Sequence, residues 1–350
     1  MPNFKFSGVC KLCNNTPVTL VMGLEYATTV HLLSADDAHT GLVYSPDFMR
    51  KLRAKTVGVG EVVSVSLGCR AFLREMEIMT RFTVTEIIPS RSPMLNEITL
   101  GCDPEFAAYL GNNRVNFKEI LARNGELGWD HNGEVGELRP PPAKFARTLL
   151  RRMRNIMRAA PEQLRSATWR SGAIAKTLPE RPPEDRSAFS FLGGHVHLGV
   201  DFRLCSLPLI TRGLDAFTNS LFKLDILPEE ENKIRQRSYG RPGDVRQDFK
   251  GGQPVIEYRT MCSWLFDPRV ALMALEGARL TTAEPEFAIG KLATPSHTNL
   301  HTFFTAFKQR SKDAAYIVEV VLPKLGKLQF DQDVQDAWEL DAPKVTQIGL

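Results

Sequence analysis

The feature that most constrains this chain is a set of three polar pairs, each placed two residues apart in an otherwise apolar stretch. Residues two apart in a β-strand point to the same face of the sheet. Charged side chains on such a face are costly to bury unless a partner neutralises them. We therefore expect a sheet with one chemically active face on which all three pairs meet in a single cleft. The pairs are Asp103 with Glu105, His195 with His197, and Glu257 with Arg259.

The composition is that of an ordinary globular protein. The 350 residues are 43% hydrophobic and 24% charged, which leaves room for two domains. No stretch approaches the roughly 18 apolar residues that cross a bilayer, and the first residues lack a signal-like apolar run. The six cysteines are scattered rather than arranged as a disulfide framework, so we expect free thiols and a cytoplasmic location.

The chain divides by pattern into three parts. Residues 16–88 read mostly as short strands, and the turn-rich segment 89–97 reads as a linker. We expect a β-rich N-terminal domain of unknown role over residues 1–92. An α+β catalytic domain, an antiparallel or mixed sheet with helices packed on it, is expected over residues 93–330. A polar C-terminal tail is expected over residues 331–350.

Two basic clusters stand out against a net charge of only +4. Residues 144–170 carry apolar residues at helical spacing, which indicates an amphipathic helix with a solvated polar face. The second cluster lies in RQRSYGRPGDVR, where glycine and proline argue against a regular helix. We expect arginines on such a loop to bind phosphate rather than to face solvent. They are Arg235, Arg237, Arg241 and Arg246.

Common nucleotide-binding and hydrolase signatures are missing, including the Walker A loop and the Rossmann glycine fingerprint. Carboxylates with an imidazole are suitable ligands for magnesium or manganese. An isolated Asp-x-Glu is more often a solvated strand edge, and an isolated His-x-His is more often structural. The glycines that flank His195 and His197 favour the functional interpretation, because they permit close approach by a ligand. The motif CKLC at Cys10 and Cys13 is half of a zinc site without its second half.

Five motifs then occur in a recognisable order: GCDPEF, GELRP, GGHVHLG, RQRSYGRPGDVR and IEYRTMCSWL. Their order resembles the phage-type carboxylate-amine ligases (amidoligase type 2), a family similar to glutamine synthetase and glutamate-cysteine ligase. The resemblance covers residues 97–270 approximately. It implies a glutamine-synthetase-like sheet, ATP, two or three magnesium or manganese ions and, for a phage-encoded protein, the host cytoplasm.

The resemblance also assigns residues to roles. Implied metal ligands are Asp103, Glu105, Glu137, His195 and Glu257. Implied phosphate- and carboxylate-binding residues are His197, Arg139, Arg235, Arg237 and Arg246. Implied catalytic residues are Arg259 at the transferred phosphoryl group, Arg241, and Asp130 as a base near the amine, with Glu134 as an alternative. Asp103 stands where glutamine synthetase has glutamate, and the ammonia-site loop of that enzyme is missing, so the amine stays open.

The resemblance implies that ATP phosphorylates a carboxylate and that an amine captures the acyl phosphate. The substrates would be a carboxylate and an amine, each on a small molecule, peptide or protein, with no membrane and no nucleic acid involved. Two alternatives remain open. One is a phosphotransferase of the same fold, and the other is a non-catalytic nucleic-acid-binding protein that uses residues 144–170.

Overall fold

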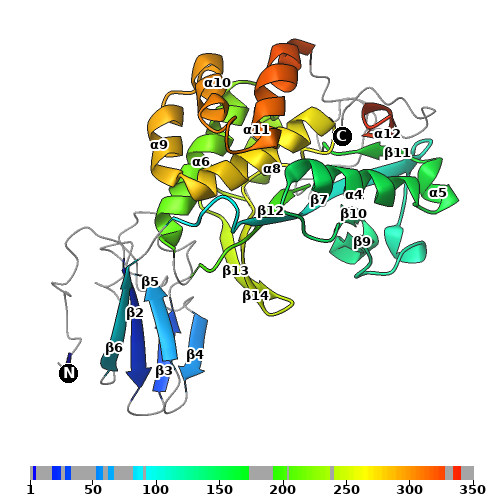
Figure 1. Ribbon diagram of the computed structural model, residues 1–350. Helices are drawn as coiled ribbons and strands as arrows, with labels where there is room; N and C mark the ends of the chain where they lie inside the picture. Colours follow the sequence, from blue (N-terminus) through cyan, green and yellow to red (C-terminus); the bar gives the residue numbers. More distant parts are fainter. Residues whose placement is uncertain are drawn as a thin grey trace.

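The structure is a computed structural model in which the chain forms separate strands near its N-terminus and a helix-covered sheet beyond them (Figure 1). The strands β1 to β6 are described up to Pro89. The remainder is described over residues 92–172, 192–202, 205–236, 240–327 and 334–339. Cys10, Cys13 and Arg237, which the sequence singled out, lie outside these residues.

The N-terminal strands form two antiparallel sheets. One has the order β1 (Asn3–Phe4), β6 (Phe82–Pro89), β2 (Val18–Leu24), β5 (Val62–Ser66). The other pairs β3 (Thr28–Leu32) with β4 (Arg53–Val57). Strands β2 to β5 lie within residues 16–88, which the sequence predicted to be mostly short strands, and β6 ends one residue beyond them. Among the described strands, those before residue 90 pair only with one another.

The main sheet is antiparallel throughout its described pairings and is centred on one long strand. Its order is β13 (Val245–Lys250), β14 (Gln253–Tyr258), β12 (Gly194–Gly199), β7 (Thr99–Leu110), β10 (Val135–Leu138), β9 (Leu127–Asp130). The far half of β7 also pairs with β8 (Asn113–Arg114) and β11 (Thr168–Arg170). This arrangement confirms the α+β class and selects the antiparallel form of the sheet.

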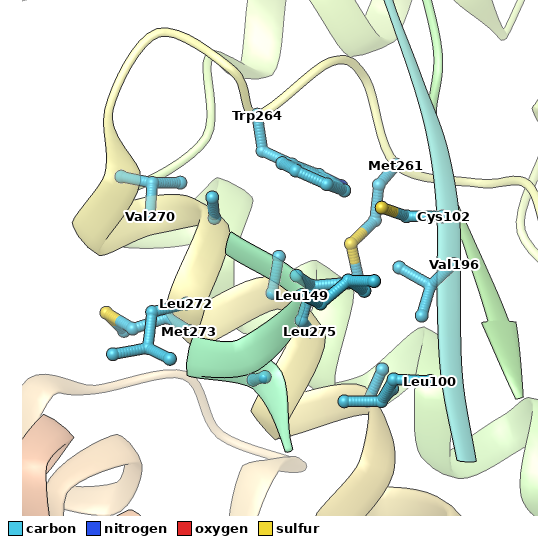
Figure 2. Close-up of a cluster of buried hydrophobic side chains, with 14 of the residues drawn as sticks. Leu100, Cys102, Leu149, Val196, Met261, Trp264, Val270, Leu272, Met273 and Leu275 are labelled. Atoms are coloured by element: carbon cyan, nitrogen blue, oxygen red, sulfur yellow. The ribbon is translucent and has the colours of Figure 1, made fainter. Parts of the chain in front are cut away.

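In the part of the chain that the structure describes, α-helices cover the apolar face of this sheet. Leu100, Cys102 and Val196 point from β7 and β12 toward Leu149 of α4 (Ala146–Arg158) and Leu275 of α8 (Pro268–Ala283) (Figure 2). All five side chains are at most 2% exposed, which gives this layer the character of a close-packed core. The side chains one position along each strand must therefore face the opposite side.

A second helical layer packs on α8, which is buried on nearly all sides. It consists of α6 (Leu207–Lys223), α9 (Pro285–Leu292), α10 (His297–Thr305) and α11 (Lys312–Tyr316). Phenylalanine rings join these helices, with Phe217 and Phe303 at a centroid separation of 5.8 Å. The sequence over residues 268–322 predicts two or three helices, and the structure has four α-helices there, α8 to α11. None of the helices in the described part of the chain combines the length and apolar character needed to cross a membrane.

The basic segment 144–170 is shorter as a helix than predicted. Helix α4 ends at Arg158, and Pro161 then begins a separate turn, α5 (Glu162–Arg165), before strand β11. Proline at this position lacks the N–H that a continuing helix needs. Part of the polar face is also occupied, because Arg152 donates to the carbonyls of Pro141 and Pro142.

The arginine-rich segment is more regular than predicted. Arg235 is the last residue of helix α7 (Glu229–Arg235), and Arg246 lies on strand β13, which the sequence did not reveal. Between them, the described residues 240–244 form the expected turn, in which Gly240 and Gly243 adopt positive φ angles of 68° and 84°. The prediction that glycine and proline exclude a helix was therefore wrong for Arg235.

Part of the expected polar tail belongs to the core. Helix α12 (Val334–Ala337) buries Val334, and the neighbouring Trp338 is 3% exposed. The indole N–H of Trp338 donates to the Leu265 carbonyl at 2.6 Å, and the Gln335 amide oxygen accepts from the Trp169 N–H at 3.0 Å. These contacts attach the segment to strand β11 and the loop before α8. The three described cysteines, Cys102, Cys205 and Cys262, are free thiols as expected.

Replacement of Gly136 by alanine is expected to destabilise the sheet beside the polar face. A Cβ atom at this position of β10 would lie 2.5 Å from Phe106 Cζ and 2.7 Å from Phe117 Cζ, and both rings are fully buried. Such overpacking costs about 1–3 kcal/mol. Thermal unfolding followed by circular dichroism measures it. Gly290→Ala is the matched control, because the added Cβ there has open space within helix α9. Equal stability of the two variants would contradict the close approach of β10 to β7.

Candidate active site

The strand register brings the three polar pairs together. Asp103 lies opposite His195, and Glu257 lies opposite His197 on the neighbouring strand. On the other side of β7, Glu105 lies opposite Glu137 of β10. All of these side chains therefore project from the face of the sheet that the helices leave open.

These side chains surround a cleft of about 660 Å³. Most of the residues predicted from the sequence line it. The lining residues are Asp103, Glu105, Arg123, Asn124, Asp130, Glu137, Arg139, His195, Arg246, Asp248, Lys250, Glu257 and Arg259. Six carboxylates and five Lys or Arg side chains thus share one small volume, which suits a polyanion bound together with cations.

Asp103 lies at the centre of this cleft, between the two histidines. Its Oδ1 is 3.0 Å from His195 Nδ1, and its Oδ2 is 3.1 Å from His197 Nε2. Burial alone would raise the pKa of the Asp103 carboxyl, but the two histidines outweigh burial and hold that pKa well below its usual range. Asp103 is therefore a carboxylate at neutral pH.

The facing glutamates Glu105 and Glu137 are crowded. Burial raises the pKa of Glu105, although the Gly193 N–H donates to its Oε2 at 2.6 Å and favours the charged form. Burial, followed by the negative charge of Asp103, raises the pKa of Glu137 to about 9. Arg139, which is hydrogen-bonded to Glu137, offsets part of this rise. Carboxyl groups in this state gain from a nearby cation.

Glu257 is surrounded by arginines. Arg259, just past the end of β14, has its Nε 3.4 Å from Glu257 Oε1 and a guanidinium nitrogen 3.6 Å from Asp244 Oδ1. Arg246 lies opposite Glu257 on β13, with a guanidinium nitrogen 3.5 Å from its Oε2. The side chain of Arg259 is 15% exposed, whereas that of Arg246 is 47% exposed. Arg259 is thus the more enclosed cation of the two.

The donor set fits a divalent cation. One ligand atom from each of Asp103, His197 and Glu257 lies within 4.8 Å of the other two. Two carboxylates with one imidazole suit magnesium or manganese. The resemblance had implied His195 as the ligand and His197 as a phosphate contact. His195 Nδ1 also lies 3.0 Å from Asp103 Oδ1 and 4.0 Å from Glu257 Oε1, so both histidines border this donor set.

The position of His195 has a physical cause. Its Nε2 is 3.1 Å from a guanidinium nitrogen of Arg235, which is 1% exposed. A guanidinium only donates hydrogen bonds, so Nε2 accepts and a neutral His195 carries its proton on Nδ1, facing Asp103. Arg235 also donates to the carbonyl of Arg259 at 2.6 Å. It therefore lies behind the cleft and supports two of its residues rather than lining it.

Two further predicted residues do not line the cleft. His197 is buried beside Asp103, and its ring nitrogens are each 3.2 Å from Lys250 Nζ. Arg241 is exposed in the turn before β13, where its Nε donates to the Gln236 carbonyl. The structure brings neither side chain to the cleft surface.

Sequence reasoning missed four lining residues. Asp248 and Lys250 alternate with Arg246 along β13, and this spacing of two was a readable strand signal directly after the segment interpreted as a loop. Arg123 and Asn124 lie in the connection before β9, where no periodic pattern marks them. The Arg123 carbonyl accepts a hydrogen bond from Arg139 at 2.7 Å, so this loop is attached to β10.

The structure is that of an α+β protein whose antiparallel sheet carries, on the face opposite α4 and α8, a cleft lined by carboxylates, a histidine and arginines. The chain belongs to the family described as phage phiEco32-like COOH.NH2 ligase-type 2, whose model matches residues 100–329. The family expected from the five motifs is therefore confirmed. By its name, this is a family of carboxylate-amine ligases. No curated protein matches the chain.

One similar solved structure is a bifunctional glutathione synthetase from Pasteurella multocida, with a TM-score of 0.37 and 12% identity. The match covers 71% of this chain and 49% of that one, so this chain spans about half the length of that enzyme.

Proposed function

We propose that the protein is an ATP-dependent ligase that joins a carboxylate to an amine through an acyl phosphate. Membership in the carboxylate-amine ligase family supports the reaction class. The observation that carries the proposal is the cleft, where six carboxylates and five Lys or Arg side chains meet on one face of the sheet. Phosphoryl transfer needs carboxylates to hold metal ions and basic side chains to bind phosphate oxygens in one small volume.

The carboxylates divide into those that would hold ions and those that would act on substrate. Asp103, His197 and Glu257 form one candidate ion site, and Glu105 with Glu137 offers further oxygen ligands. Bound magnesium or manganese would neutralise charge on the phosphate oxygens of ATP. The raised pKa of Glu137 supports this division, because that group gains most from a positive neighbour.

The Lys and Arg side chains of the cleft also fall into two groups, those that would bind the phosphates of ATP and one that would bind the substrate. Arg259, enclosed between Glu257 and Asp244, is positioned to contact the transferred phosphoryl group, and Arg246 with Lys250 would bind the remaining phosphates. At the opposite side of the cleft, Arg139 would orient the substrate carboxylate. A planar guanidinium suits both tasks, because it donates two parallel hydrogen bonds to phosphate or carboxylate oxygens.

The proposed reaction has two steps, phosphorylation of the carboxylate and capture of the acyl phosphate by the amine. A substrate carboxylate oxygen attacks the γ-phosphorus of ATP, the bond to the bridging oxygen breaks, and ADP leaves. The amine nitrogen then attacks the acyl carbon, and inorganic phosphate leaves with the electrons of the acyl C–O bond. The proton lost from nitrogen needs a base, and Asp130, on the same cleft, would accept it.

A ligase screen tests the proposal directly. The full-length protein is incubated with ATP, magnesium and pooled carboxylates and amines, and mass spectrometry detects a condensation product whose mass is the sum of the two substrates minus water. We expect ADP and phosphate in equal amounts, both dependent on the amine. A phosphorylated product that accumulates to the same level with or without amine would identify a phosphotransferase instead.

Asp130→Asn is expected to lower amine-dependent product formation by about a hundredfold, the usual contribution of a general base. The single turnover that forms ADP and the acyl phosphate without amine should change little, because the first step does not need this base. Glu134→Gln is the matched control, since Glu134 lies on the same hairpin but its carboxylate is half-exposed and pairs with Arg114. Equal loss of both activities in Asp130→Asn would reject the role as base.

A further inference from the structure

A second large groove lies away from the candidate active site. It occupies about 1100 Å³ between the segment 92–98, the start of α4, the end of α8 and the turn between α10 and α11. It shares no lining residue with the cleft. Helices α4 and α8 cover the apolar face of the sheet (Figure 1). The strand residues that line the cleft project from the other face. The chemistry of the cleft therefore does not explain this groove.

The groove is strongly basic. Seven Lys or Arg side chains and two carboxylates line it. Three of its four arginines are already bound to carboxylates: Arg147 to Asp313 at 2.5 Å, Arg310 to Glu284 at 3.0 Å, and Arg279 to Glu276 at 2.7 Å. Four exposed cations are left with no carboxylate paired to them in the part of the chain that the structure describes. They are Lys144, Arg151, Lys308 and Lys312.

Two large apolar side chains are exposed on the same groove. Met94 is 58% exposed in the segment before β7, and Phe145 is 54% exposed at the start of α4. Phe145 is also the residue before the first turn of α4 and provides no side-chain cap, so the positive end of the helix dipole adds to the basic field. Exposed apolar groups rimmed by charge are typical of a surface that binds a partner.

We propose that this groove docks an acidic peptide segment that carries apolar side chains. The carboxylates of such a segment would meet the four exposed cations, while its apolar side chains would cover Met94 and Phe145. A nucleic acid would match the charge equally, but its phosphate backbone offers nothing to these two apolar side chains. The proposal is independent of the reaction in the cleft.

Binding of a fluorescein-labelled peptide of alternating glutamate and leucine to the full-length protein tests the proposal, with fluorescence anisotropy as the readout. The double variant Lys308→Glu with Lys312→Glu should weaken binding at least about tenfold, since two attractions become repulsions. The matched control is Arg158→Glu with Arg165→Glu. Both arginines are exposed at the ends of α4 and α5, outside the groove, and their replacement should leave binding unchanged.

A second variant separates docking from general charge attraction. Phe145→Ser keeps every charge and should still weaken binding of the peptide at least about fivefold, because an apolar contact is lost. ADP formation should not change in any of these variants. Equal weakening by the groove and control double variants would overturn the proposal. So would tighter binding of single-stranded DNA of equal charge, lost steeply with salt and indifferent to Phe145→Ser.

Discussion

Glu257→Gln is expected to lower the rate of ADP formation about a hundredfold or more while leaving the fold intact. The substitution removes a negative charge from the point where the candidate ion site meets Arg259 and Arg246. Groups that stabilise developing charge in an enclosed site typically contribute this much when removed singly. Glutamine is nearly isosteric with glutamate, so the packing of β14 against β12 should survive.

Manganese binding provides the second readout for this variant. Calorimetric titration of the protein without nucleotide should show weaker binding in Glu257→Gln than in the parent, by about tenfold or more. Glu319→Gln, an exposed glutamate in the helical region, should match the parent in both measurements. If Glu257→Gln fails to fold, Glu257→Asp keeps the charge and shortens its reach, and the same losses are expected. Full activity with unchanged manganese affinity would remove Glu257 from the ion site.

Arg259→Lys is expected to keep ATP binding but to lose about a hundredfold in ADP formation, equivalent to about 3 kcal/mol of transition-state stabilisation. Lysine keeps the charge but offers a point donor instead of the planar fork. Arg246→Lys should have a smaller effect, because the Arg246 side chain is 47% exposed and solvent already screens it.

Arg259 could instead have a purely structural role, because one of its guanidinium nitrogens lies 3.6 Å from Oδ1 of Asp244, the residue before β13. If its task is only to join these segments, Arg259→Lys should lower the melting temperature more than it lowers turnover. Nucleotide affinity, melting temperature and ADP formation measured on the same protein distinguish the two. Unchanged ADP formation would reject the proposed contact with the phosphoryl group.

The sequence was most informative where one residue spacing has one structural meaning. Polar residues two apart within the apolar stretches around Asp103 and His195 predicted one active sheet face, because a strand sends alternate side chains to opposite sides. The glycines around His195 indicated a close approach. A Cβ at Gly193 would lie 2.5 Å from His195 Nε2 and 2.7 Å from a guanidinium nitrogen of Arg235.

Where glycine and proline interrupt the pattern, the sequence was misleading. The segment around Arg235 and Arg246 reads as one loop, yet a helix ends at the first arginine and a strand contains the second. Strand β13 forms because its backbone pairs with β14 across the turn at Gly251 and Gly252, and the segment around the arginines does not itself report this pairing. Propensity is a weak guide wherever such pairing decides the outcome.

The sequence by itself determined the family, the sheet face that carries the polar pairs, and most of the residues on that face. These follow from short-range spacing and motif order, which are local properties. Only the tertiary structure decided which strands are neighbours and therefore which charges meet. It placed both histidines beside Asp103, put Arg235 behind the cleft, and added Lys250. The contacts of the two histidines depend on pairing between strands more than fifty residues apart, which fixes distances that no local pattern encodes.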